Sequence, residues 1–109
     1  MAQNFKHSTN GITLGTANTL IYGPVAADVT AIVFSGSFPN LDDTNKIQHT
    51  VTVQKYDGTT YNKELNAIPV PYGSASKCPK IVLLPGESLY ASCDVASMIG
   101  VSLSVLELS

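Results

Sequence analysis

The sequence lacks several residue types whose scarcity limits what the protein does. Its 109 residues include no tryptophan, two cysteines and two histidines, and 13% of them are charged. All six cations are lysines, so arginine is absent, and the net charge is −2. Nucleic-acid sites favour the bidentate contacts of arginine and a basic surface. We therefore expect no direct binding to DNA or RNA.

Long apolar runs are also missing. The longest, such as residues 81–84, are far shorter than the roughly 20 residues that a membrane-spanning helix needs. The first residues, 1–7, lack the apolar stretch of a secretion signal. We expect a protein that is made and folded in a cytoplasm and has no membrane partner.

What the sequence does contain is a normal share of apolar residues and many small polar ones. A chain of 109 residues with 44% hydrophobic residues is long enough for one domain with its own core. Its charged fraction of 13% compares with about one quarter in an average soluble protein. A surface of Ser, Thr, Asn and Gln loses little solvation free energy when a partner covers it. The composition therefore favours a protein with large contact surfaces.

Alternation of apolar and polar residues predicts strands. In residues 99–108, Ile99, Val101, Leu103 and Val105 alternate with small residues, which places them on one face of a β-strand. Residues 46–56 place Ile47, His49, Val51 and Val53 on one face in the same way. Residues 29–37 have a continuous apolar centre, which indicates a strand that is buried on both faces.

Turn residues divide the remaining chain. Asp57-Gly58 and Pro85-Gly86 each predict a hairpin, between residues 46–56 and 60–68 and between residues 80–84 and 88–93. Residues 38–45 and 70–79 are expected to be loops, and residues 5–14 and 18–22 a weak and a short strand. The count is about eight strands, no helix and no repeat. We expect an antiparallel β-sandwich of jelly-roll or immunoglobulin-like topology over residues 11–109, preceded by an extended N-terminal arm over residues 1–10.

Cys78 and Cys93 are expected to lie opposite each other if the Pro85-Gly86 hairpin is regular. This pairing makes a disulfide conceivable, but it places the cysteines at a hydrogen-bonded position, where the α-carbons are farther apart. No secretion signal indicates an oxidising compartment. We therefore favour two reduced, packed thiols, and their spacing from His7 and His49 matches no zinc motif.

Few residues suggest chemistry. His49 is either a ligand or pH-sensitive interface residue, or a histidine at the edge of the core that is hydrogen-bonded to the backbone, which we favour. Asp42, Asp43 and Asn45 offer oxygen ligands for a cation, but their spacing favours an Asx-rich turn. The serine-rich turns lack a nucleophile-elbow pattern, and the glycine-containing segment 11–15 lacks the lysine of a phosphate loop. We expect no catalytic, metal or cofactor site and no enzyme activity.

Five segments together carry a family resemblance that spans nearly the whole chain. They comprise a short polar arm (residues 2–6), a proline-containing strand connection (residues 19–22, 24–25 and 29–33), an alternating strand (residues 51–53), a proline-glycine turn (residues 83–89) and an alternating terminus (residues 101–107). With these segments, the sequence resembles small β-sandwich virion proteins of tailed bacteriophages.

The resemblance implies a structural protein of the virion, made in the host cytoplasm. Such proteins serve as capsid decoration (cement) proteins, which bind the major capsid protein, or as neck and tail accessory proteins. It also implies a homo-oligomer, with a trimer favoured. Six residues are candidate partner contacts, three in the arm and three in loops: Phe5, Lys6, His7, Phe38, Leu41 and Tyr72. A fibre-associated receptor- or carbohydrate-binding module is the alternative, with sugars stacking on tyrosines: Tyr22, Tyr56, Tyr61, Tyr72 or Tyr90.

Overall fold

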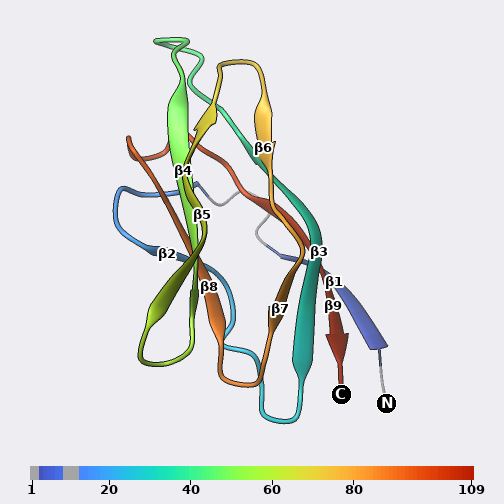
Figure 1. Cartoon of the computed structure of the whole chain (residues 1–109). Coiled ribbons are helices and arrows are strands. Elements are labelled where there is room, and N and C mark those ends of the chain that lie inside the picture. Colours follow the sequence, from blue (N-terminus) through green and yellow to red (C-terminus); the bar gives the residue numbers. More distant parts are fainter. Residues whose placement is uncertain (1–2, 9–12) are drawn as a thin grey trace.

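The computed structural model describes residues 3–8 and 13–109 of the chain. These residues form nine strands and no helix, and the strands make two antiparallel sheets packed face to face (Figure 1). The predicted all-β sandwich is confirmed. The strands are β1 (Gln3–Ser8), β2 (Thr19–Tyr22), β3 (Thr30–Pro39), β4 (His49–Tyr56), β5 (Tyr61–Val70), β6 (Ala75–Lys77), β7 (Ile81–Leu83), β8 (Ser88–Cys93) and β9 (Ser102–Leu108).

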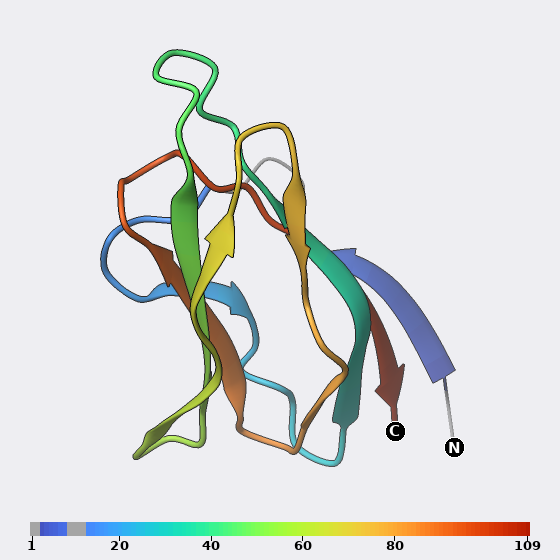
Figure 2. The same cartoon turned by 45° about the horizontal axis from the view of Figure 1, so that its top comes forward.

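The five-stranded sheet has the order β1-β9-β3, and both β6 and β7 pair with the other side of β3. β6 pairs with the end of β3 at residues 37–39, and β7 pairs with its beginning at residues 31–33. The four-stranded sheet has the order β2-β8-β4-β5. The view in Figure 2 shows the two layers and the segments that cross between them.

The core fills the space between the two sheets with apolar residues that alternate with outward-facing residues along the strands. In β4 the predicted face is confirmed for His49, Val51 and Val53, which are at most 1% exposed. Ile47 lies before this strand and is 51% exposed, so its assignment to the same buried face was wrong. In β9, Leu103 and Val105 are buried as predicted, and Ile99 and Val101 are buried in the segment that leads into this strand.

The Pro85-Gly86 turn is not a hairpin. β7 pairs with β3, whereas β8 pairs with β2 and β4, so the turn carries the chain from one sheet to the other. The expectation that Cys78 and Cys93 face each other across a hairpin was therefore wrong. The Asp57-Gly58 hairpin is confirmed, because β4 and β5 pair antiparallel across it.

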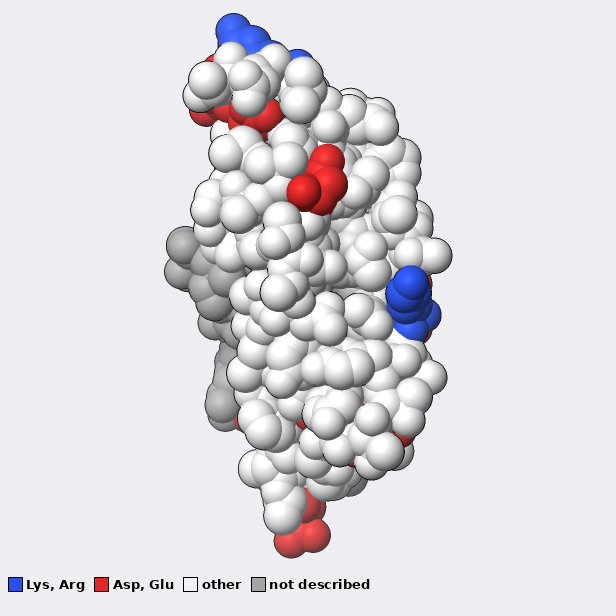
Figure 3. All heavy atoms as spheres, turned by 90° about the vertical axis from the view of Figure 1, so that its left-hand side faces the viewer, with Lys and Arg blue, Asp and Glu red and all other residues white. Residues whose placement is uncertain are grey.

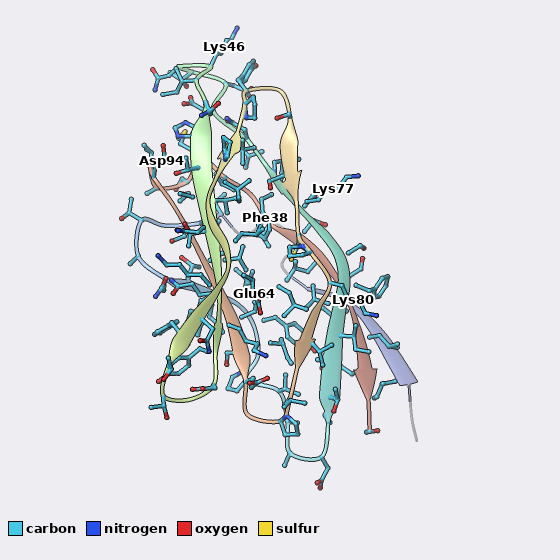
Figure 4. The ribbon with its side chains drawn as sticks, viewed as in Figure 1. Phe38, Lys46, Glu64, Lys77, Lys80 and Asp94 are labelled. Carbon is cyan, nitrogen blue, oxygen red and sulfur yellow. The ribbon has the colours of Figure 1, made fainter. Side chains whose placement is uncertain are left out.

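Two segments expected to be loops contribute strands. The first expected loop, residues 38–45, begins inside β3, and Phe38 is 0% exposed and lies between the sheets (Figure 4). A register shift between Val33 and Ser35 explains the burial: it moves the inward positions from Ala31 and Val33 to Phe38. The second, residues 70–79, contains β6.

β1 pairs antiparallel with β9 of the same chain, from Gln3 opposite Leu108 to Ser8 opposite Leu103. Residues 3–8 of the expected N-terminal arm thus form an edge strand of the five-stranded sheet. The remaining arm positions, residues 1–2 and 9–10, lie outside the described residues. Contact of this segment with a neighbouring subunit stays a prediction.

Candidate functional site: the loop end of the sandwich

Three connections meet at one end of the sandwich, at the top of Figure 1, and we call them the loop end. They are the β3–β4 loop (residues 40–48), the β5–β6 loop (residues 71–74) and the β8–β9 loop (residues 94–101). Backbone hydrogen bonds join them: Asn40 N donates to Ser74 O at 3.0 Å, and Leu41 N donates to Met98 O at 2.8 Å. The loops therefore support one another.

Asn40 anchors the loop end from inside. Its side chain is 8% exposed, and its Nδ2 donates to two backbone carbonyls, Ile47 O and Val70 O, each at 2.9 Å. Its Oδ1 accepts a hydrogen bond from Asp42 N at 2.9 Å. An asparagine side chain that bridges three backbone groups fixes both ends of the β3–β4 loop relative to β5.

Next to Asn40, a histidine lies between two carboxylates. His49 Nε2 is 2.7 Å from Asp42 Oδ2, and His49 Nδ1 is 3.0 Å from Asp94 Oδ1. The His49 and Asp42 side chains are each 1% exposed, whereas the side chain of Asp94, which Figure 4 labels, is 40% exposed. We call Asn40, Asp42, His49 and Asp94 the buried polar network.

Each carboxylate of the network also accepts a backbone hydrogen bond. Asn45 N donates to Asp42 Oδ1 at 2.9 Å, which is the Asx turn that the sequence predicts. Thr50 N donates to Asp94 Oδ1 at 3.2 Å. His49 is hydrogen-bonded to side chains, so the expectation of a backbone partner was wrong. The network joins the start of β4 to loops on both sides of it.

The hydrogen bonds of the network shift two pKa values in opposite directions. The hydrogen bond with Asp42 raises the pKa of His49, and the bond with Asp94 adds to this, against the opposing effect of burial. The hydrogen bond with His49 lowers the pKa of Asp42, and the amide of Asn45 lowers it further. Both shifts favour the ion pair of an imidazolium with a carboxylate.

Around this network, the loop end exposes four large apolar side chains. Leu41 is 46% exposed, Ile47 51%, Tyr72 41% and Val95 46%. Tyr72 OH donates to Asp43 Oδ1 at 3.1 Å, which raises the pKa of the phenol and orients its ring. A β-carbon added at Gly100 would lie 3.1 Å from Leu41 Cδ1, so the glycine makes room for this leucine. We call these four residues the apolar rim.

The structure separates the six contact residues predicted from the sequence. Leu41 and Tyr72 are exposed together at the loop end. Phe38 is fully buried in the core, so it cannot contact a partner, and its assignment to the surface was wrong. Phe5, Lys6 and His7 lie in β1 on the five-stranded sheet.

Three residues of the loop end were missed by the sequence analysis. Ile47 was assigned to the core because it continues the alternation of β4. Val95 and Asp94 follow β8 in a loop without any distinctive spacing. The sequence contains no signal for Asp94, because this residue lies near the other loop residues only in the folded structure.

A second feature lies on the outer face of the four-stranded sheet, near the opposite end. Tyr56 and Tyr61 stack with ring centroids 4.4 Å apart, and Tyr90 packs edge-on against them at 5.9 Å and 5.5 Å. Most of the face seen in Figure 3 carries no charged atoms. Of the five tyrosines, these three gather, whereas Tyr22 donates a hydrogen bond to Glu107 and Tyr72 lies at the loop end.

The two cysteines are free, buried thiols. Burial raises the pKa of Cys78 to about 11, with a smaller contribution from Glu64. Burial also raises the pKa of Cys93, whose Sγ lies 2.9 Å from Val95 O. A thiol with a raised pKa is a poor nucleophile at neutral pH, so both cysteines serve as packing residues.

Within residues 3–8 and 13–109, no group of three or more His, Cys, Asp or Glu side chains is arranged to hold a metal ion. The same part of the chain contains no helix that is long and apolar enough to cross a membrane. Comparisons with protein-family models, with curated proteins and with solved structures find no match to this chain.

Proposed function

We propose that the protein is a non-enzymatic structural component of a tailed-bacteriophage virion, a capsid decoration protein that binds the assembled shell through its loop end. The observation that carries this proposal is the apolar rim held on loops that the buried polar network fixes. The family resemblance of the sequence supports the virion setting.

Exposed apolar side chains on fixed loops are suited to binding a preformed protein surface. Leu41, Ile47, Tyr72 and Val95 bury apolar area when a partner covers them, which contributes roughly 25 cal/mol per Å² of buried apolar surface. Because hydrogen bonds already order the three loops, binding costs little additional conformational entropy. The loop end therefore provides a preorganised contact patch.

The proposed mechanism is a linkage between binding and shell stability. A protein that binds the assembled shell and has no affinity for free subunits adds its binding free energy to the assembled state. Many copies bound at equivalent positions of the shell multiply this stabilisation. No chemical step is involved.

Co-sedimentation tests the proposal. Purified protein is mixed with capsids and, separately, with tails of the encoding phage, each prepared without this protein. We expect saturable binding to expanded capsids. Leu41→Ser combined with Tyr72→Ser should weaken it about tenfold or more, because centrally buried anchors each contribute about 1 kcal/mol or more. Leu84→Ser is the matched control, since Leu84 is 53% exposed and lies at the other end of the sandwich.

Other outcomes change the assignment. Binding to tails alone would make the protein a neck or tail accessory protein. Binding to neither particle would refute the virion proposal. Binding to capsids that Leu84→Ser weakens as much as the rim variant would refute the loop end as the contact surface.

The tyrosine cluster favours carbohydrate binding as a second candidate function. Three aromatic rings on a sheet face with few charged atoms, next to the hydrogen-bonded amides of Gln54 and Asn18, offer apolar contacts and hydrogen bonds to a sugar. A glycan-binding screen tests this function. Binding that is lost in Tyr90→Ala and kept in Tyr72→Ala would support it, and no binding to any glycan would refute it.

A further inference from the structure

The two sheets have four edges, and one of them differs from the rest. The edges are β2 and β5 in the four-stranded sheet, and β1 and the β6–β7 side in the five-stranded sheet. An exposed, regular strand edge is a template for another strand, so proteins normally protect it with short strands, bulges, proline or charge. The edges of this protein are protected to different degrees.

Three of the edges carry such protection. β2 has four residues and a register shift, and β6 and β7 have three residues each. β5 has ten residues, but its pairing with β4 is shifted twice, and it contains Pro69 and the positive φ of 50° at Ala67. None of these edges offers a regular row of free backbone groups longer than a few residues.

β1 has only one such protective feature, a single charge. Its six residues pair with β9 in unbroken register, and its sequence contains no proline, no glycine and one cation, Lys6. Within residues 3–8 and 13–109, no strand pairs with its other side. Among the strand edges of the described residues, β1 is therefore the most regular one that no other strand covers.

From this comparison we propose that β1 pairs antiparallel with β1 of a second copy of the chain, which joins two five-stranded sheets into one continuous sheet. The partner is the same strand, so the interface is isologous and closes on itself around a two-fold axis. This inference goes beyond the shell-binding proposal and does not depend on it. It also replaces the expected trimer by a two-fold pair as the unit of self-association.

The register of the pair follows from the rows of the sheet. Residues directly opposite each other on neighbouring strands share a face. Ile32 lies opposite Val82 on one side and Leu106 on the other, and Leu106 lies opposite Phe5. A two-fold axis that places Phe5 opposite Phe5 of the second copy continues this row across both molecules.

The same register places charges favourably. Lys6 then lies opposite Asn4 of the second copy, and Asn4 itself lies opposite Glu107. Each lysine thus shares a row with a carboxylate of the other copy, two strand spacings away, about 10 Å. The neighbouring register that places Lys6 opposite Lys6 is disfavoured, because like charges directly opposite each other are destabilising.

Sedimentation equilibrium over a concentration series tests the proposal. We expect the wild-type chain to form dimers and Asn4→Lys to weaken dimerisation about tenfold, because the new lysine lies opposite Lys6 of the other copy at two equivalent positions. The substitution should leave the monomer folded, since it lies opposite Glu107 in its own chain. Asn66→Lys on the β5 edge is the matched control and should dimerise like the wild type, because no lysine is directly opposite this position.

Reversing the charge at position 6 tests whether the loss of dimerisation comes from like charges. Asn4→Lys combined with Lys6→Glu should restore dimerisation, since each lysine then lies opposite a glutamate of the other copy. A chain that stays monomeric at every concentration would overturn the proposal. So would a dimer that Asn4→Lys leaves unchanged, or a trimer in place of the dimer. Because these experiments contain no capsid, their result does not depend on shell binding.

Discussion

The two ends of the sandwich use polar residues in different ways. At the loop end, His49 and Asp42 are almost completely buried and hydrogen-bonded to each other and to the backbone. At the opposite end, near the Asp57-Gly58 and Pro85-Gly86 turns, Lys55 Nζ lies 3.6 Å from Glu87 Oε1, and these side chains are 25% and 13% exposed. The two ends thus differ in how far water screens their charges.

The two ends also differ in what holds their connections in place: side chains from distant parts of the chain at the loop end, and residues of the turn itself at Asp57-Gly58. The Asp57-Gly58 turn of the opposite end is short and self-contained: the Asp57 carboxylate accepts hydrogen bonds from the amides of Thr59 and Thr60. The loop end contains longer connections, and side chains from distant parts of the chain fix them. Long loops that are ordered in this way are suited to a contact surface.

Removing the histidine should produce the largest effect. We expect His49→Ala to lower the free energy of unfolding by about 3 kcal/mol, because it leaves the buried Asp42 carboxylate without its partner and opens a cavity. Urea unfolding measures this change. A loss below about 1 kcal/mol would mean that the buried polar network contributes no more than the partly exposed pair at the other end.

The next largest effect is expected in the pH dependence of the free energy of unfolding, to which His49 and Asp42 of the loop end contribute. The raised pKa of His49 implies stabilisation that is fully present below its unfolded value of 6.5 and is lost as the pH rises through the folded value. The lowered pKa of Asp42 implies stabilisation that is present above its unfolded value of 3.8 and is lost as the pH falls through the folded value. The network should therefore contribute most between these two unfolded values.

Urea unfolding of the wild type and of His49→Gln over a pH series checks this expectation. The stability difference between the two proteins should shrink as the pH rises above 6.5. A constant difference between mildly acidic and alkaline pH would contradict the assigned ion pair.

Asp94→Asn should have a moderate effect. Asp94 is 40% exposed, so its loss costs less than the loss of a buried partner, and we expect about 1 kcal/mol. It should also lower the pKa of His49, since Asp94 contributes to the upward shift. NMR titration of the His49 ring measures this pKa, and an unchanged value would show that Asp42 alone sets it.

The smallest effect is expected at the opposite end. Lys55→Met removes the partly exposed pair with Glu87 and keeps most of the side-chain volume, so the stability should fall by less than about 1 kcal/mol. This small loss should shrink further at high salt. A loss as large as that of His49→Ala, measured by the same urea unfolding, would remove the distinction between the ends.

Local patterns predicted the strands better than the connections between them. Alternation identified the buried face of β4, and Asp57-Gly58 identified its hairpin, because both signals act between neighbours in sequence. Pro85-Gly86 gives the same local signal, but its flanking strands pair with other partners. Which strands pair depends on contacts that a turn sequence does not encode.

The same limit applies to the candidate site. Leu41 and Tyr72 were predicted as contacts from their place in polar loops, and the structure exposes both. Phe38 was misplaced because a bulge in β3 changes which residues face inward. The partner of His49 in the β8–β9 loop, Asp94, lies 45 residues away in sequence, a separation that no motif spans.

The position of β9 has a consequence for the order in which the chain folds during its synthesis. β9 lies between β1 and β3, and Gln3 pairs with Leu108. On the ribosome, β1 therefore has no intramolecular partner until residues 102–108 have left the exit tunnel. Contacts between such distant residues form slowly. The edge that we assign to self-association is therefore completed only after the strands of the four-stranded sheet have emerged.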